Sequence, residues 1–93
     1  MTVGVLRIEL SIPGTHSLKE KRMVLKSLKT RLRNNFNISV AEVAMQDKWQ
    51  KAIVGIAAVN EDKRYLNGQL DKVIDFIEGF RDTQIIDYEM ELC

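Results

Sequence analysis

Apolar residues change their spacing at Pro13-Gly14, and no other feature of the sequence limits the fold as strongly. Before that turn they alternate from Thr2 to Ile12, which predicts a strand with one apolar face. From Ser17 to about Asn35 they recur every three or four residues, which predicts an amphipathic helix. The residues expected to face the core are Leu6, Ile8, Leu10, Ile12, Leu18, Leu25, Leu28, Leu32 and Phe36.

Three more strand-like runs and one more helical run make up the rest of the chain. Asn37–Gln46 and Gln50–Val59 are separated by a short polar link, which predicts a hairpin. The second of these runs is apolar on both faces, as expected for a central strand. Asn60 is predicted to be the N-cap of a second helix that ends near Asp82. Gln84–Leu92 alternates again and predicts a last strand.

The predicted element order is therefore β-α-β-β-α-β. Two helices on one face of a four-stranded antiparallel sheet satisfy this order, which is the α+β, ferredoxin-like sandwich. Right-handed crossovers place the first and third strands in the middle of the sheet. With 93 residues, 45% of them hydrophobic, we expect one domain over residues 1–93.

The sequence favours a cytoplasmic location without a membrane partner. The longest apolar run, Ala52–Val59, is far shorter than the roughly 20 residues that span a bilayer. Arg7 and Glu9 interrupt the N-terminal run, where a signal segment would be apolar. Cys93 is the single cysteine, so we expect no internal disulfide and a reducing compartment.

Positive charge is concentrated on the first predicted helix. Residues 17–36 hold seven basic residues and one acidic residue, a balance of +6, whereas the rest of the chain has a balance of −5. At about 100° per residue, five of these cations fall on one stripe, about 21 Å long, beside the apolar face. We call this set the basic stripe: Lys19, Arg22, Lys26, Lys29 and Arg33.

Two interpretations of the basic stripe remain open. It has no acidic partner within its own helix, so it is a candidate for binding a polyanion such as RNA. It could equally pair with carboxylates on the second helix, which would make it structural. The candidate partners on that helix are Asp71, Asp75 and Glu78.

The segment His16–Arg22, which begins this helix, also has two interpretations. Ser17 and Glu20 match a capping box, in which Ser17 accepts from the amide of Glu20 and Glu20 reaches back to the amide of Ser17. The alternative is a phosphate held by free amides together with His16 and Lys19. A glutamate in the first turn would repel that anion, and the segment lacks a G-x-x-x-x-G-K pattern, so capping is favoured.

The helix-free face of the sheet suits a second copy of the chain better than RNA. RNA-recognition domains with this element order stack bases on aromatic residues of the central strands, and these strands have none. An apolar centre at Val3 and Val5 favours a homodimer through this face, with a small ligand at the interface as an alternative function. Trp49, in the hairpin, is either a lid on the core or an interface anchor.

Catalytic chemistry is poorly represented in the sequence. His16 has no cysteine or second histidine with which to build a metal site, and Cys93 has no base near it in sequence. We therefore expect no catalytic residue, metal or cofactor. An acylphosphatase-like hydrolase, the less favoured alternative, would need an arginine in the first strand-to-helix loop, and "IPGTHS" has none.

Glu42 interrupts an apolar strand. Three explanations are open: its side chain faces inward, it marks a bulge, or its charge protects an edge strand against aggregation. We prefer the third.

Three parts of the sequence resemble the YlxP-like family of small bacterial proteins, a domain of unknown function. They are "HSLKEKR" (residues 16–22), Phe36–Val43 and the turn from Asp47 to Gln50, and the similarity runs from about Val3 to Leu92. The resemblance implies a ferredoxin-like fold, a bacterial cytoplasmic setting and no established catalytic residues. Its members are often encoded beside translation-initiation and ribosome-maturation factors. The resulting hypothesis is a non-enzymatic accessory factor that contacts RNA or the ribosome through the basic stripe.

Overall fold

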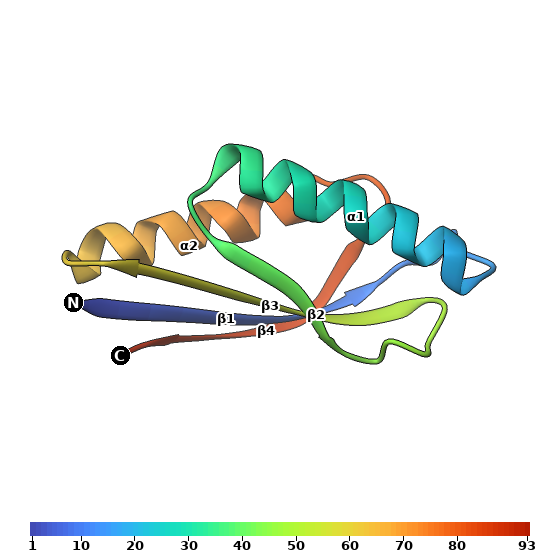
Figure 1. The fold of residues 1–93 in the computed structure, drawn as a ribbon, viewed down its shortest axis with the longest axis horizontal. Helices are drawn as coiled ribbons and strands as arrows, with labels where there is room; N and C mark the ends of the chain where they lie inside the picture. Colours follow the sequence, from blue (N-terminus) through green and yellow to red (C-terminus); the bar gives the residue numbers. More distant parts are fainter.

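The computed structural model describes all 93 residues and contains six elements in the order β-α-β-β-α-β. Two helices cover one face of a four-stranded sheet (Figure 1), so the fold is the predicted α+β, ferredoxin-like sandwich. The elements are β1 (Thr2–Ser11), α1 (Leu18–Asn35), β2 (Ser39–Ala44), β3 (Lys51–Asn60), α2 (Lys63–Glu78) and β4 (Gln84–Leu92).

The strands lie in the order β2-β3-β1-β4, and every pairing is antiparallel. β1 and β3 are therefore central and β2 and β4 are the edges, as the right-handed crossovers predict. The register pairs Leu6 with Ile56 on one side and with Met90 on the other, so these three side chains share the helix-covered face. A bulge between Glu42 and Ala44 interrupts the pairing of the β2 edge.

The core lies between the sheet and the two helices and consists of 18 buried apolar side chains. The apolar face predicted for β1 is buried in full, and so are the three leucines predicted for the middle of α1. Leu18 and Phe36, at the two ends of that helix, are only half-buried. Phe36 meets Phe76 of α2 edge to face, with the ring centroids 5.9 Å apart, and this contact joins the helices.

The opposite face of the sheet has no helix over it, as Figure 1 shows. Apolar side chains gather on its β1–β3 part, where Val5 is 41% and Val59 60% exposed. The β4 edge of the same face is acidic, because Glu89 and Glu91 lie opposite Arg7 and Val5 in the register. This face is therefore apolar in the middle and negative along one edge.

The second helix begins two residues later than the sequence predicts. Its N-cap is Asp62, whose Oδ1 accepts hydrogen bonds from the amides of Arg64 at 2.9 Å and Tyr65 at 3.2 Å. Asn60 is still part of β3, and its Oδ1 accepts from the amide of Asp62 at 2.9 Å. The prediction of Asn60 as the cap was wrong because Asn60 pairs with Thr2 as the last residue of β3, which leaves Asp62 next to the first turn of the helix.

Two predicted elements are shorter in the structure. α2 ends at Glu78 rather than near Asp82, because Gly79 occupies the C-cap, where its amide donates to the carbonyl of Asp75 at 3.1 Å. β2 covers Ser39–Ala44 rather than residues 37–46. Its early end follows from Met45, whose φ of 62° is left-handed and incompatible with a strand.

The position of the cap predicts different costs for two neighbouring substitutions. Asp62→Ala is expected to lower the free energy of unfolding by about 1 kcal/mol, because two amides of the first turn lose their acceptor. Asn60→Ala serves as the control and should cost less, since it removes one exposed hydrogen bond outside the helix. Urea unfolding of both variants measures the difference. If Asn60→Ala lowers the free energy of unfolding as much as Asp62→Ala or more, the assignment of Asp62 as the N-cap is contradicted.

Candidate nucleic-acid interface

The basic stripe lies on the flank of α1 that faces the β2 edge. At its C-terminal end, Arg33 Nη2 donates to the carbonyl of Val40 in β2 at 2.9 Å. The opposite flank of α1 faces α2: the Arg31 guanidinium lies 5.6 Å from the ring centroid of Phe80. On that flank Arg31 and Ser27 line a cavity of about 600 Å³ that also touches the end of α2. The stripe therefore points away from α2, which lies behind α1 in Figure 1.

No carboxylate neutralises any member of the basic stripe. The ion pair between Lys21 and Glu42 is the only one in the structure. The alternative interpretation, in which the stripe pairs with carboxylates of α2, is therefore wrong. None of its candidates, Asp71, Asp75 and Glu78, forms an ion pair with the stripe. Four members make no hydrogen bond or ion pair with the protein and cover about 15 Å of the helix axis. They are Lys19, Arg22 and Lys26, which are exposed, and Lys29, which is half-buried.

Arg33 differs from the other members of the stripe because it already has a partner. Its guanidinium is bonded to the carbonyl of Val40, which belongs to an edge strand. An unpaired carbonyl at a sheet edge is a template for pairing with another chain, so this bond protects the edge. Arg33 therefore has a structural role, and the part of the stripe available to a ligand is Lys19 to Lys29.

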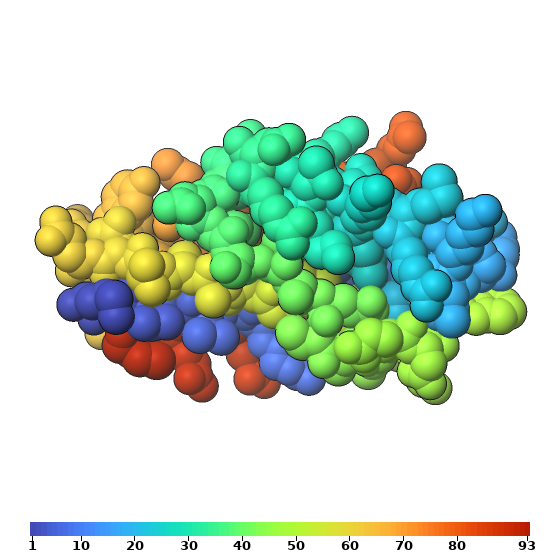
Figure 2. All heavy atoms as spheres, viewed as in Figure 1, coloured from blue at the N-terminus to red at the C-terminus, as the bar shows by residue number.

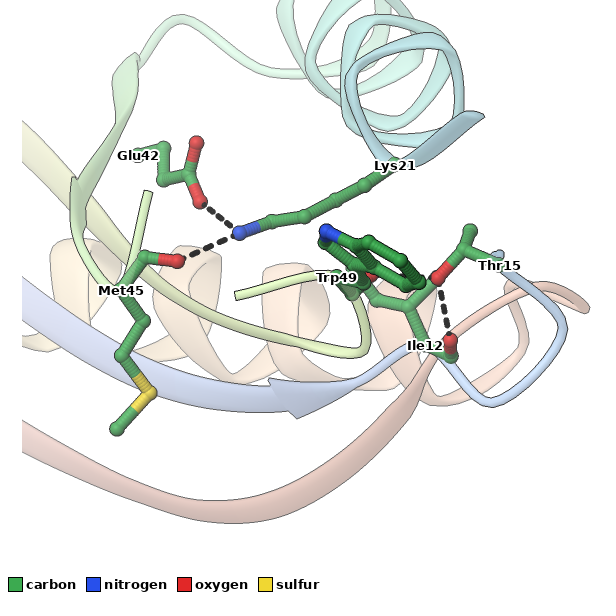
Figure 3. A network of polar contacts seen from close by, with 6 residues as sticks. All are labelled: Ile12, Thr15, Lys21, Glu42, Met45 and Trp49. Carbon is green, nitrogen blue, oxygen red and sulfur yellow. Dashed lines mark hydrogen bonds and ion pairs between the residues drawn. The ribbon is translucent and has the colours of Figure 1, made fainter. Parts of the chain in front are cut away.

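Lys21 lies beneath α1, and its side chain is only 1% exposed. Its Nζ lies 2.8 Å from Glu42 Oε2 and donates to the carbonyl of Met45 at 2.7 Å, as Figure 3 shows. Glu42 is 16% exposed and faces inward beside the β2 bulge. The structure therefore bears out the other two explanations, an inward-facing side chain and a bulge, rather than the one we preferred, a charge that guards the edge strand. Glu42 neutralises a buried cation instead.

The sequence contained one signal for this buried pair. Lys21 lies three residues after Leu18 and four residues before Leu25, so helical geometry places it on the apolar face of α1. A lysine is almost never fully buried without a partner, and an interrupted apolar strand that carries Glu42 offers one. The pairing itself joins residues 21 positions apart, which periodicity cannot predict.

The loop before α1 and the β2–β3 hairpin are bonded to each other. Thr15 Oγ1 donates to the carbonyl of Trp49 at 2.5 Å and is also within bonding distance of the carbonyl of Ile12, at 2.8 Å. Gln50 Nε2 donates to the carbonyl of Thr15 at 2.9 Å, and the amide of Ile12 donates to the carbonyl of Gln50 at 2.8 Å. Figure 2 shows the hairpin surface directly below the first turns of α1. The hairpin is thus held at the N-terminal end of the basic stripe.

The start of α1 is capped by its own side chains. Ser17 Oγ accepts from the amide of Glu20 at 3.1 Å, as the capping box predicts. Glu20 Oε2 accepts from the amide of His16 at 2.7 Å, one residue before the predicted partner Ser17. A carboxylate therefore occupies the position that the alternative interpretation gave to a phosphate.

Trp49 lies far from the other two interface candidates of the sequence, Val3 and Val5. Val3 and Val5 are near the start of β1, on the helix-free face of the sheet. Trp49 precedes Lys51, which pairs with Ser11 at the other end of β1. Val5 and Ser11 are six residues apart, or about 20 Å along the strand. Trp49 is 55% exposed and is not among the core residues, so it is not a lid on the core.

Residues 3–90 match the family described as protein of unknown function DUF503. The chain belongs to this family. It is 40% identical over 82 residues to the uncharacterised protein YlxP of Bacillus subtilis (strain 168), which covers 88% of this chain and 89% of YlxP. The resemblance to the YlxP-like family that the sequence motifs indicate is confirmed.

A match to a solved structure covers the whole of this DUF503 chain. That structure is LarC2, the C-terminal domain of a cyclometallase involved in the synthesis of the NPN cofactor of lactate racemase, in its apo form. The identity is 10% and the TM-score 0.49. The DUF503 chain is matched over its full length and spans about half of the LarC2 chain, 55%.

Two further features of the DUF503 chain concern membranes and metals. Neither helix has the length and the apolar character needed to cross a bilayer. No group of three or more His, Cys, Asp or Glu side chains is close enough to hold a metal ion.

Proposed function

We propose that this protein is a non-enzymatic, RNA-binding accessory factor that contacts the phosphate backbone through Lys19, Arg22, Lys26 and Lys29. The proposal rests on one observation: these four cations lie on one flank of a helix without a protein partner. Lone surface cations are common, but an unneutralised row of them attracts a polyanion over distances of about 10 Å. RNA is favoured over other polyanions because YlxP-like proteins are often encoded beside translation-initiation and ribosome-maturation factors.

The surroundings of the stripe also support contact with a backbone. Glu42, the acidic residue of the neighbouring strand, is held inward by Lys21 and so does not compete for the stripe. Glu20 lies on the other flank of α1 and is occupied by the amide of His16. The stripe offers ammonium and guanidinium groups in a row along the helix, which suits contacts with successive phosphates, and phosphate contacts carry no sequence information. Binding through it should therefore depend little on sequence.

The salt dependence of binding tests the proposal. If three or four stripe residues contact phosphates, a plot of log affinity against log salt should have a slope of about −2 to −4. Fluorescence anisotropy with labelled RNA at several salt concentrations measures the slope, and DNA of the same sequence provides a comparison. A slope near zero, or no binding at low salt, would exclude phosphate contact through the stripe.

A homodimer through the helix-free face of the sheet, with a small ligand at its interface, is the second candidate. The exposed valines on that face, Val5 and Val59, favour it, because apolar patches often mark protein interfaces. The acidic β4 edge would have to meet Arg7 or Lys51 of the second copy. Light scattering at micromolar concentration tests the dimer, and a strictly monomeric particle excludes it.

A further inference from the structure

We infer that Trp49 stacks on an unpaired base of the bound RNA, so that the ligand is a single strand or loop rather than a continuous duplex. This inference rests on the proposed RNA-binding function and adds a second contact to it. The basic stripe alone would accept any phosphate backbone. An exposed indole beside the stripe would select nucleic acid whose bases are free to stack.

Trp49 is held in position by contacts that involve its backbone and leave its indole half-exposed. Its carbonyl accepts from Thr15 Oγ1 at 2.5 Å, and the next residue, Gln50, donates to the carbonyl of Thr15 at 2.9 Å. Thr15 is 3% exposed, so this anchor is part of the folded body. Figure 3 shows the Trp49 ring in the corner that also contains Lys21, below the start of α1. An aromatic side chain on a backbone that the fold already fixes loses less entropy when a base stacks on it.

The carbonyl of Trp49 is bonded to Thr15, in the loop that leads directly into the first member of the stripe. Lys19 is only four residues beyond Thr15, in the first turn of α1. Lys48 and Lys51, on either side of Trp49 in the chain, are also exposed and unpaired. A nucleotide stacked on the indole would therefore have cations near its own phosphate and near those of its neighbours. Asp47 is the one acidic residue in the hairpin.

None of the other aromatic residues combines exposure with a place at the start of the stripe. Tyr65 is 60% exposed but lies in the first turn of α2, near the opposite end of α1. Phe36, Phe76 and Phe80 are buried or pack against the core. Tyr88 is 46% exposed but lies on β4, the sheet edge opposite β2, between acidic residues. Stacking contributes roughly 1–3 kcal/mol per base in single-strand-binding proteins, which corresponds to about 5- to 150-fold in affinity. Because Tyr88 is an exposed aromatic residue away from the stripe, it serves as the matched control for Trp49.

Trp49 is the only tryptophan, so its own fluorescence reports on stacking. Wild-type protein is titrated with an oligouridylate of about 12 nucleotides and with an RNA duplex of equal length, while anisotropy of labelled RNA reports binding independently. We expect the single strand to quench Trp49 and the duplex to leave its emission largely unchanged. Trp49→Ala should weaken single-strand binding about 5- to 150-fold and duplex binding less than about 2-fold. Trp49→Phe should restore part of the loss, and Tyr88→Ala should change neither.

The outcomes separate this inference from the proposed function. Salt-dependent binding with unquenched Trp49 and an unaffected Trp49→Ala variant would overturn stacking and leave the phosphate contacts standing. Equal losses for single strand and duplex would also overturn it, because the tryptophan would then act only on the fold. If neither RNA binds the wild-type protein, the proposed function fails and stacking fails with it. The quenching measurement needs no variant, so it decides the matter even if Trp49→Ala does not fold.

Discussion

The triple variant Lys19→Glu, Arg22→Glu and Lys26→Glu is expected to bind RNA about 100- to 1,000-fold more weakly than the wild-type protein at about 50 mM salt. The three residues are exposed and make no bond within the protein, so the change acts on the ligand alone. Each reversal removes an attraction to phosphate and adds a repulsion. The variant's remaining binding should also depend less on salt, because fewer counterions are released.

The choice of these three positions keeps the fold intact. Glutamate is as good a helix former as lysine, and in the first turn its negative charge interacts favourably with the positive end of the helix dipole. Arg33 is left in place because it bonds to Val40, and Lys29 because it is half-buried. Circular dichroism and the urea midpoint confirm that the variant is folded.

A second triple variant with the same change of net charge is the control. Lys63→Glu, Lys72→Glu and Arg81→Glu alter exposed cations on α2 and the loop that follows it, away from the stripe. If binding follows the position of the charges, this control keeps most of its affinity. If the two triple variants lose affinity equally, binding follows net charge and the stripe is not an interface.

Glu42→Ala is expected to lower the free energy of unfolding by about 3 kcal/mol, the largest loss of stability that a single polar substitution should cause here. The substitution leaves the Lys21 ammonium buried at 1% exposure with the Met45 carbonyl as its remaining partner. Removing one member of a buried ion pair costs far more than breaking a surface pair, which is worth about 0–1 kcal/mol. Urea or thermal unfolding, monitored by circular dichroism, gives the value.

The double variant Lys21→Met with Glu42→Leu separates charge burial from packing. Replacing both members by apolar side chains of similar volume is often neutral or stabilising, so its stability should lie close to the wild type. A loss below about 1 kcal/mol for Glu42→Ala would show that the pair behaves as a surface ion pair and would contradict the burial of Lys21. A double variant as unstable as the single one would assign the loss to packing instead of charge.

The ion pair also bears on the proposed interface. Lys21 connects α1 to β2 and to Met45, whose left-handed φ of 62° is unfavourable for a side chain with a Cβ. Next to it, hydrogen bonds of Thr15 with Trp49 and Gln50 hold the hairpin against the loop that leads into the basic stripe. The RNA interface that we propose is thus assembled around a buried charge that does not itself reach the surface.

The spacing of apolar residues along the chain was sufficient to predict most of the fold. The change from alternating to helical periodicity at Pro13-Gly14 predicted β1 and α1, and the six-element order then left a single favoured topology. The Ser17 cap followed from short-range pattern as well. The second helix was misplaced at its start because Asn60 and Asp62 are equally good caps, and only pairing within the sheet assigns Asn60 to β3.

The sequence by itself determined which side chains of α1 share a face, because helical geometry depends only on neighbouring residues. It could not decide whether the basic stripe met α2 or solvent, since that depends on which flank of the helix packs against which strand. The tertiary structure decided this by bonding Arg33 to β2 and setting Arg31 over Phe80. It likewise joined Lys21 to Glu42, a contact between distant residues that burial makes obligatory and no local pattern specifies.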